Sequence, residues 1–504
     1  MSTIRRQSIL SSGIVYFGFG LGILNTYLFT RQGGFTPAEY GLTTIFTSIA
    51  FIMYSCANLG MQGFVFKFYP YYDDNLPNKK NDMITLTLVA AVAGFILVVA
   101  GGLVFQNFFI RKFGEHSPEL VIYYHWIFIF GFGLTIYSLL EAYAWQLKKS
   151  VFTNYLKEFQ FRAFTTLLIV LFITKFLRSF DSFIKLYSFG YLIIAVILLS
   201  YLVIKKEIYF TFSLSRVTKK FKRKIATLAL LIWSGSLLHN IATVYSGVVI
   251  AAVMPKGLAT AASFTLAQYM TSIMQAPQRG IIGASMAPLS KSWKDKDFKK
   301  INIIYHRSSV NQLIFSAGIF SLIWLNFTDG VLTFHLQESY LDAKYVFLFL
   351  GLNCIIDMGT GLNAQIIATS TFWRFDFITG IVLLGISLPL TYLLTKTIGI
   401  TGPAIATLFS FTVYNLIRYI FLLKKFDMQP FNAKTAYALL LPAADFFVCY
   451  YLFSNRHGYL WIIVRSLVFI AIYFPAVIYF KLSPDIMPVW QTIKKRLGLT
   501  VSVK

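Results

Sequence analysis

The chain has 504 residues, of which 57% are hydrophobic and only 13% are charged, and its formal net charge is +25. A composition this apolar excludes an ordinary soluble enzyme, because the chain could not cover its surface with polar atoms. The positive charge alone would suit a nucleic-acid-binding protein, but no soluble domain is present to carry a basic patch, so no nucleic-acid partner is expected.

Apolar runs of about 20 residues recur along the chain, and each is long enough as a helix to cross ~30 Å of hydrocarbon. Helices are expected because every backbone polar group in a membrane must be satisfied within its own segment. The sequence therefore predicts an all-α polytopic membrane protein with about fourteen transmembrane helices. In chain order the spans lie near residues 9–30, 40–64, 83–106, 120–141, 161–177, 183–204, 226–252, 259–284, 308–326, 344–369, 375–395, 402–423, 436–453 and 460–480.

Lys and Arg are divided unequally between the two sets of connections. One set, counted with the N-terminus, holds 32 of the 45 basic residues. Because cytoplasmic loops are enriched in Lys and Arg, both termini are predicted in the cytoplasm and the basic rim is expected to face anionic lipids. The first span follows MSTIRRQS without a cleavage site and is expected to be retained in the cytoplasmic (inner) membrane.

The connections leave no room for a soluble catalytic or nucleotide-binding domain, and no phosphate loop of the form GxxxxGK[ST] occurs. Cys56, Cys354 and Cys449 fall in predicted spans, so a disulfide framework is not expected. The six His are scattered without metal-ligand spacing. We therefore expect no enzyme, no cofactor and no metal site.

An internal repeat is indicated by two proline pairs. Pro37 and Pro70 flank the second span, and Pro255 and Pro288 flank the eighth with the same spacing. Six spans per copy is an even number, so the two bundles would share one orientation about a pseudo-two-fold axis along the membrane normal. The predicted organisation is a six-helix bundle at 1–207, a basic cytoplasmic linker at 208–225, a second six-helix bundle at 226–426, and spans 13 and 14 with a basic tail at 427–504.

Four span ends carry distinctive motifs, which are GGFTPAEYGL at 33–42, NLGMQGFVFKFYP at 58–70, GITGPAIATLFS at 399–410 and IRYIFLLKK at 417–425. These motifs resemble the span ends of Wzx-type polysaccharide flippases. Together they look like the polysaccharide transporter branch of the MOP superfamily, related to MATE exporters and lipid II flippases. The resemblance implies a fourteen-span fold and transport of a lipid-linked glycan. One departure is that many members carry an acid in span 7, where this chain reads VYSGVVIAAV at 244–253.

Polar residues at bilayer depth are costly, and they usually face a cavity or a partner. Asn25 in span 1 and His239, Asn240 and Thr243 in span 7 lie on polar faces that the repeat places in register. These four residues are candidates for the wall of a substrate cavity, and helix–helix contact is the alternative. His239 is also a candidate for proton coupling, and a hydrogen-bonded core histidine is about equally expected.

Asp357 lies about 13 residues into span 10, with Asn353 on the same helical face. An ionised carboxylate at this depth needs a partner, water or a proton, so Asp357 is a candidate for coupling to H+ or Na+, with Asn353 as a cavity residue. A fixed hydrogen-bonded acid is the alternative. Glu141, at the end of span 4, is a second coupling candidate, although Lys148 and Lys149 close behind it favour an interfacial acid.

Two further charges are expected to be structural. Asp445 and Arg465 lie at similar depths on the hairpin of spans 13 and 14, which predicts an ion pair between them. Arg418 lies six residues before Lys424. Snorkelling of Arg418 to the cytoplasmic rim is therefore at least as expected as a place in a cavity.

The stretch IMQAPQRGIIG at 273–283 places a helix breaker and a cation inside span 8. Pro277 removes a backbone hydrogen bond and frees a carbonyl near Ile273. Gln278 and Arg279 would then offer donors to a pyrophosphate. A snorkelled or ion-paired Arg279 is the alternative.

These features favour a flippase that moves a polyprenyl-diphosphate oligosaccharide to the outer leaflet, where membrane lipids and glycan polymerases or glycosyltransferases would be its partners. A pyrophosphate requires Arg or Lys, and a sugar chain requires side chains that match hydroxyl groups, which the 30 Tyr suit. The alternatives are a MATE-like small-molecule antiporter and, in another class, a non-transporting component or enzyme of polysaccharide assembly.

Overall fold

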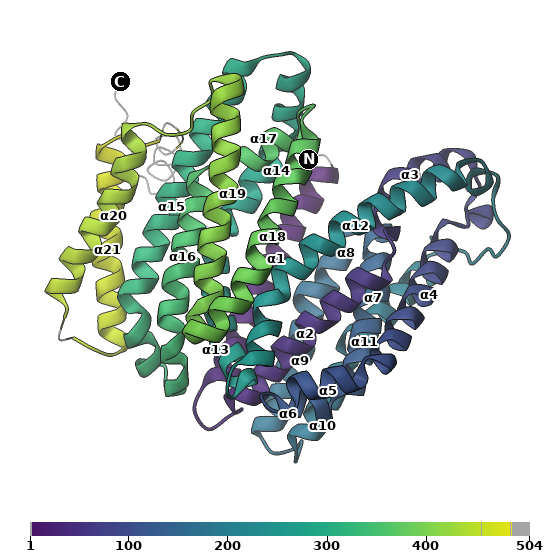
Figure 1. Cartoon of the computed structure of the whole chain (residues 1–504), viewed down its shortest axis with the longest axis horizontal. Coiled ribbons are helices and arrows are strands. Elements are labelled where there is room, and N and C mark those ends of the chain that lie inside the picture. The colour runs from purple at the N-terminus through teal and green to yellow at the C-terminus, as the bar shows by residue number, and fades with distance from the viewer. Residues whose placement is uncertain (1–2, 455, 484, 486–504) are drawn as a thin grey trace. The chain divides into compact units, whose positions relative to one another are not determined.

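The structure is a computed structural model that describes residues 3–454, 456–483 and 485, and the regular elements in these residues are all helices. The chain forms two compact units, Met1–Ala262 and Ser263–Lys504 (Figure 1).

The first unit contains α1 (Thr3–Thr30), α2 (Pro37–Ala57), α3 (Met61–Asn75), η1 (Asn78–Lys80), α4 (Met83–Val104), α5 (Gln106–Phe113), α6 (Pro118–Ile122), α7 (Tyr124–Gln146), α8 (Ser150–Asn154), the π-helical η2 (Tyr155–Gln160), α9 (Phe161–Ile173), α10 (Phe180–Ser188), α11 (Gly190–Ile204), α12 (Arg216–Val253) and the start of α13 (Gly257–Met274).

The second unit contains the rest of α13 and the helices that follow it. These are α14 (Ala276–Lys294), α15 (Phe298–Thr333), η3 (Glu338–Asp342), α16 (Ala343–Gly359), α17 (Asn363–Ala368), α18 (Trp373–Ile398), η4 (Gly399–Thr401), α19 (Gly402–Phe426), α20 (Ala433–Leu452) and α21 (Tyr459–Tyr479).

Eight helical stretches among the described residues are long and apolar enough to cross a membrane, by length and composition. They are Pro37–Ala57, Asn78–Val104, Tyr124–Gln146, Phe180–Ile204, Phe298–Thr333, Arg374–Phe426, Ala433–Leu452 and Tyr459–Tyr479. The stretch Arg374–Phe426 joins two of the predicted spans through η4. The prediction of an all-α polytopic membrane protein is therefore confirmed, whereas the count of fourteen spans stays a prediction.

In the first unit, α7 is the central helix and packs against α2, α3, α4 and α11. The apolar, membrane-length part of α7 is the most buried among the eight candidate spans, with 83% of its residues inside the protein. The long helix α12 packs against α2 and α3, so span 7 groups with the first unit. Helix α12 begins at Arg216, within the predicted linker at 208–225, and continues without interruption into the span. The predicted division into two six-helix bundles stays a prediction.

The start of α2 explains part of the family-like motif at 33–42. Thr36 caps the helix and accepts from the backbone N–H of Glu39 at 3.2 Å, while Glu39 accepts from the backbone N–H of Thr36 at 2.7 Å. Pro37 then occupies the first helical turn, where a backbone N–H would have no hydrogen-bond partner within the helix, so the missing N–H of proline costs nothing. Residues Thr36–Glu39 of the motif thus encode a helix start.

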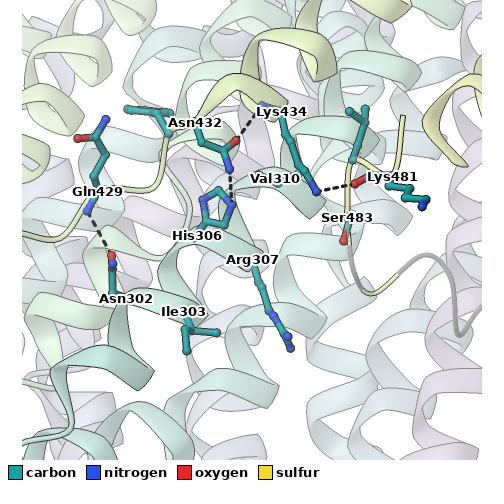
Figure 2. A pocket seen from close by; sticks show the side chains of 12 residues that line it. Asn302, Ile303, His306, Arg307, Val310, Gln429, Asn432, Lys434, Lys481 and Ser483 are labelled. Atoms are coloured by element: carbon teal, nitrogen blue, oxygen red, sulfur yellow. Dashed lines mark hydrogen bonds between the residues drawn. The ribbon is translucent and has the colours of Figure 1, made fainter. Parts of the chain in front are cut away.

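In the second unit, α15 is the central helix, and α14, α16, α20 and α21 pack against it. The hairpin of α20 and α21 lies along α15 (Figure 1). The loop before α20 and the residues after α21 enclose a cavity at one end of this group (Figure 2). On the other side of α16, helix α19 packs against both α16 and α18.

Two of the predicted spans are interrupted in the second unit. Span 8 is divided between α13 and α14 at Gln275, two residues before Pro277, as the proline predicts. Span 10 is divided between α16 and α17 at residues 360–362. Broken helices at membrane depth free backbone polar groups, so such breaks are tolerated only where they are buried in protein or line a cavity.

Candidate functional site

The two helix breaks of the second unit come together at a half-buried carboxylate, that of Asp357. Asp357 lies in the last turn of α16, where its Oδ2 accepts from Nε2 of Gln278 at 3.0 Å. Gln278 lies in the first turn of α14, immediately after the other break. The second carboxylate oxygen, Oδ1, accepts from Nδ2 of Asn415 in α19 at 3.2 Å. The sequence predicts Gln278 and Asp357 as separate candidates, and the structure brings them into direct contact.

Asn415 extends this cluster to the far side of the break in span 10. Its Oδ1 accepts from Oγ1 of Thr360 at 3.1 Å and from Nδ2 of Asn363 at 2.8 Å. The amide of Asn415 is thus engaged at both ends, and the residues on either side of the break are bound to one side chain. We name these five residues, Gln278, Asp357, Thr360, Asn363 and Asn415, the Asp357 cluster.

The break between α16 and α17 depends on Gly361. This residue has φ +66°, in the left-handed region that disfavours side chains. A Cβ at this position would lie 3.0 Å from Oγ of Ser308 and 3.1 Å from the carbonyl oxygen of Tyr305, both on α15. The hydroxyl of Ser309 also donates to the carbonyl of Gly359 at the end of α16. The break is therefore held open by close packing against α15.

Arg418 lies one turn beyond Asn415 on α19. Its guanidinium forms an ion pair with Asp376 of α18, donates to Oγ1 of Thr379 at 3.3 Å and lies 3.9 Å from the ring centre of Tyr414. Arg418 is only 1% exposed, so its guanidinium is buried within the protein and does not extend to its surface. One of its nitrogens, Nη1, is buried without a hydrogen-bond partner among the described residues.

Other predicted residues of the second unit lie near this region or outside the described side chains. Asn353 is buried on α16, one turn before Asp357, and its Oδ1 has no partner among the described residues. The side chain of Arg279 lies outside the described residues, so its predicted contact with substrate stays a prediction. Sequence reasoning did not find Asn415 as a site residue, although NLIR at 415–418 carries the one-turn spacing of Asn415 and Arg418.

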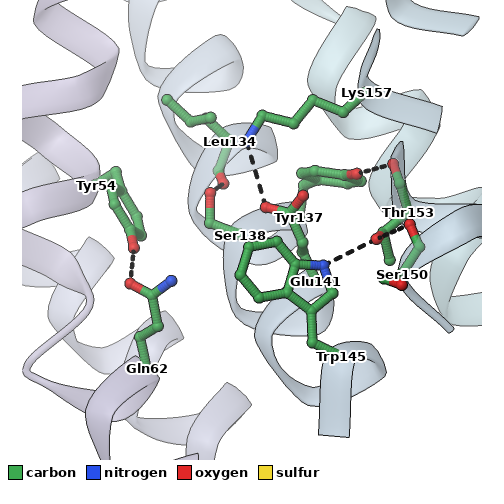
Figure 3. A network of polar contacts seen from close by, with 10 residues as sticks. All are labelled: Tyr54, Gln62, Leu134, Tyr137, Ser138, Glu141, Trp145, Ser150, Thr153 and Lys157. Atoms are coloured by element: carbon green, nitrogen blue, oxygen red, sulfur yellow. Dashed lines mark hydrogen bonds and ion pairs between the residues drawn. The ribbon is translucent and has the colours of Figure 1, made fainter. Parts of the chain in front are cut away.

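In the first unit, a buried acid lies beside the π-helical segment. Glu141 is 5% exposed, and its Oε2 lies 3.4 Å from Nζ of Lys157 (Figure 3). Its other oxygen, Oε1, is buried without a partner among the described residues. The sequence favours an interfacial acid beside Lys148 and Lys149. Lys149 instead pairs with Glu207 at 2.8 Å.

The π-helical turn at Tyr155–Gln160 brings more charge to this place. Glu158 forms an ion pair with Arg162 at 2.8 Å, and Arg162 also donates to the backbone carbonyl of Gly18 in α1 at 2.9 Å. A Cβ at Gly18 would lie 2.3 Å from the carbonyl oxygen of Glu158, so α1 and the π-turn are in close contact. Single π-turns inside α-helices frequently mark functional sites.

Asn25 belongs to the same helix contact. Its Nδ2 donates to the backbone carbonyl of Arg162 at 3.0 Å, and its Oδ1 accepts from Oγ1 of Thr166 at 2.6 Å. Asn25 is buried, and both ends of its amide are used between α1 and α9. Asn25 therefore makes a helix–helix contact, which is the alternative that the sequence leaves open to a place in the cavity wall.

The predicted polar face of span 7 is divided between two environments. Asn240 donates from Nδ2 to Oγ of Ser55 in α2 at 2.9 Å, which ties α12 to α2. Thr243 is exposed and donates to the backbone carbonyl of Asn240 in its own helix at 2.7 Å. The side chain of His239 lies outside the described residues.

The predicted ion pair between Asp445 and Arg465 is wrong. Arg465 pairs instead with Asp329 of α15 at 2.6 Å and donates to Oδ1 of Asn326 at 2.9 Å. Asp445 accepts a long contact of 3.6 Å from the thiol of Cys449. The hairpin of α20 and α21 packs along α15, so Arg465 of α21 meets an acid from the neighbouring helix rather than from its own hairpin.

No protein-family model and no curated protein matches this chain, but solved structures do. A structure described as the lipid II flippase MurJ in an inward closed conformation has a TM-score of 0.72 and 16% sequence identity, over 94% of this chain and 99% of that one. An inward-facing multidrug resistance MATE family transporter of the MOP superfamily has a TM-score of 0.64 and 13% identity, over 83% and 98%. The fold is that of MurJ and the MATE transporters.

A third solved structure widens this comparison. It is a MOP superfamily transporter from Pyrococcus furiosus, with a TM-score of 0.55 and 14% identity, over 84% of this chain and 95% of that one. At identities this low, the likeness establishes the MurJ/MATE fold and does not establish the function of this chain. Within the described residues, no group of three or more His, Cys, Asp and Glu is placed to hold a metal ion.

Proposed function

We propose that this protein is a flippase for a lipid-linked oligosaccharide, a polyprenyl-diphosphate glycan, which it moves from the cytoplasmic to the outer leaflet for export of an O-antigen-type surface polysaccharide. The observation that carries the proposal is the likeness to the MurJ structure, which spans 94% of this chain and 99% of that one. The Wzx-like span ends at 33–42, 58–70 and 399–410 favour the polysaccharide branch over other members of the superfamily.

The mechanism we propose is ion-coupled alternating access. Each unit contributes a polar cluster, centred on the half-buried Asp357 in one and on the buried Glu141 in the other. Asp357 is the main coupling candidate, because amide groups rather than a cation contact its carboxylate among the described side chains. Such a carboxylate can exchange H+ or Na+ as its surroundings change. Glu141, with one oxygen unpartnered, is the second candidate.

The pyrophosphate is assigned to the start of α14. Gln278 and Arg279 lie in its first turn, where backbone N–H groups and the helix dipole favour an anion. Asn353, with an unpartnered amide oxygen one turn from Asp357, is suited to a sugar hydroxyl. The protein would act in the inner membrane with both termini in the cytoplasm, beside the glycosyltransferases or polymerase of the same glycan.

A MATE-like small-molecule antiporter is the second candidate, and the MATE family transporter at a TM-score of 0.64 favours it. The two functions differ in the cargo that the cavity must bind. A cationic drug would favour a site dominated by acids, whereas a pyrophosphate requires cations. A non-transporting component or an enzyme of polysaccharide assembly is a third class. The fold likeness to a flippase and to transporters weighs against it.

Deletion of the gene tests the proposal. The expected result is loss of surface glycan, with its lipid-linked precursor retained on the inner leaflet. Complementation with Arg279→Gln should fail to restore surface glycan while the protein still inserts, and Lys291→Gln, an exposed cation on the same helix, should restore it. Normal surface glycan together with altered drug susceptibility would instead establish the antiporter.

A further inference from the structure

A cavity of about 630 Å³ lies in the second unit, away from the Asp357 cluster (Figure 2). Its walls come from the start of α15, the loop and first turn of α20, and the residues that follow α21. The lining residues are Asn302, Ile303, His306, Arg307, Val310, Gln429, Phe431, Asn432, Lys434, Lys481, Leu482 and Ser483.

The cavity is preformed, because hydrogen bonds join its three walls. His306 of α15 donates from Nδ1 to the carbonyl of Pro430 at 2.7 Å and accepts at Nε2 from Nδ2 of Asn432 at 2.9 Å. Asn432 is also the N-cap of α20 and accepts from backbone N–H groups of that helix. Nζ of Lys434 donates to the carbonyl of Lys481 at 2.8 Å, which closes the wall between α20 and the end of α21.

The polar lining is cationic. Arg307, Lys434 and Lys481 are permanent cations, and His306 is neutral when one ring nitrogen donates and the other accepts as described. Among the described residues, the carboxylate of Asp485 approaches these cations, at 3.8 Å from Nη1 of Arg307. This separation is at the limit of an ion pair between exposed side chains, and such pairs contribute little. The cavity therefore retains an excess of positive charge.

The rest of the lining is apolar and suits a lipid rather than a soluble anion. Val310 and Leu482 are buried in the wall, Phe431 adjoins them, and the exposed Ile303 lies one turn from Arg307. The α15 and α20 walls belong to candidate membrane spans, and the third wall follows α21 directly. Cations beside apolar side chains at the end of membrane spans are the pattern expected at the phosphate level of a leaflet.

We propose that this cavity binds the phosphate of an anionic phospholipid headgroup, with Arg307, Lys434 and Lys481 as the phosphate ligands and the apolar wall against the glycerol and upper acyl chain. The segment after Asp485 is not the expected occupant, because it carries Lys494, Lys495, Arg496 and Lys504. A basic tail would be repelled from a cationic cavity. The bound lipid would hold the hairpin of α20 and α21 to α15, apart from any transport step.

The test compares lipid retention by the purified full-length protein in nanodiscs of phosphatidylcholine with and without phosphatidylglycerol, measured by native mass spectrometry. Wild type should retain phosphatidylglycerol preferentially. The variant Arg307→Gln/Lys434→Gln/Lys481→Gln should bind it about a hundredfold more weakly, since each cation beside an anionic lipid contributes about fivefold in affinity. The charge-preserving variant Arg307→Lys/Lys434→Arg/Lys481→Arg should retain most of the binding.

The matched control removes two Lys and one Arg elsewhere. Lys219→Gln/Lys222→Gln/Arg223→Gln changes exposed residues near the start of α12 and should bind as wild type. Loss of binding in this control as well would overturn the proposal, because net charge alone would then explain the effect. Full displacement of the lipid by inorganic phosphate or glycerol 3-phosphate would overturn it in favour of a soluble anion. Unaltered phosphatidylglycerol binding in the Gln variant would also overturn it.

Discussion

Asp357 differs from Asp329 and Asp376 of the same unit in its partners. Asp329 and Asp376 each face an arginine, whereas the carboxylate of Asp357 is bound by the side-chain amides of Gln278 and Asn415. An acid that is paired with a buried cation is held ionised and cannot easily exchange a proton or metal ion. Amide donors stabilise a carboxylate without fixing its charge in this way. Asp357 is therefore better suited than Asp329 or Asp376 to a changing charge state.

Exchange of Asp357 for Asn should abolish ion dependence and preserve the fold. Asn keeps the shape and an acceptor for one amide, but it cannot bind H+ or serve as an anionic ligand for Na+. We expect transport to fall at least about tenfold, equal to about 1.4 kcal/mol of activation free energy, and to lose its dependence on pH or Na+. The assay is glycan delivery to the outer surface in cells or in reconstituted vesicles.

Asp342→Asn is the matched control, because it makes the same change at an exposed position before α16. Transport and its ion dependence should be unchanged in this control. If Asp357→Asn transports with the ion dependence of wild type, Asp357 is not the coupling acid, and Glu141 becomes the residue to change next.

At the level of the helix, Gly361 determines where span 10 breaks. Gly361→Ala should destabilise the protein by about 1–3 kcal/mol, because a side chain is strained at φ +66° and the new Cβ would press on α15. Gly380→Ala is the control. Gly380 lies in the interior of α18 with nothing within 4 Å of an added Cβ, so it should be neutral or gain about 0.5–1 kcal/mol.

Denaturant unfolding in detergent measures the free energy of unfolding of both glycine variants and of wild type. Equal stability of Gly361→Ala and wild type would mean that the break between α16 and α17 does not require a glycine. The Asp357 cluster would then have to be held in place by its side chains alone.

The docking of the α20–α21 hairpin on α15 depends on a buried ion pair. Arg465→Gln leaves Asp329 without its main partner and should cost about 3 kcal/mol, at the lower end for a broken buried pair because His457 still reaches Asp329 at 3.1 Å. The double variant Arg465→Met/Asp329→Leu removes both charges and should recover much of this loss.

Asp445→Asn separates this arrangement from the pairing that the sequence predicts. Asp445 contacts Cys449 and not Arg465, so its exchange should change the midpoint of thermal unfolding little. A loss as large as that of Arg465→Gln would indicate that Asp445 and Arg465 do act as a pair.

The sequence predicted the features that local chemistry determines. Pro277 indicated the break in span 8, and the helices do divide two residues before it. The break at Gly361 was not predicted, because its cause is close packing against α15, which lies about 50 residues earlier in the chain. The partners of Arg465 and Arg418 were missed for the same reason. Depth along a span can be counted from sequence, but the neighbouring helix that supplies the acid cannot.

At the level of the whole molecule, orientation in the membrane follows from the distribution of basic residues. Helix α15 tests it most directly, because this single uninterrupted helix of 36 residues is about 50 Å long and its two ends differ in nearby charge. Its first turn carries Lys299 and Lys300, next to the basic stretch at 291–296, whereas Glu338 follows its last turn. The positive-inside rule therefore predicts that Lys299 lies in the cytoplasm and Glu338 outside.

Single cysteines at these two positions should react differently with a membrane-impermeant maleimide. In a background with Cys56, Cys354 and Cys449 replaced by Ala, Glu338→Cys should be labelled in intact cells. Lys299→Cys should be labelled only after the membrane is permeabilised. Both native positions are exposed, so protection can be attributed to the membrane rather than to burial. The reverse pattern would invert the proposed topology and place the cationic cavity in the outer leaflet. Labelling of both in intact cells would mean that α15 does not span the membrane.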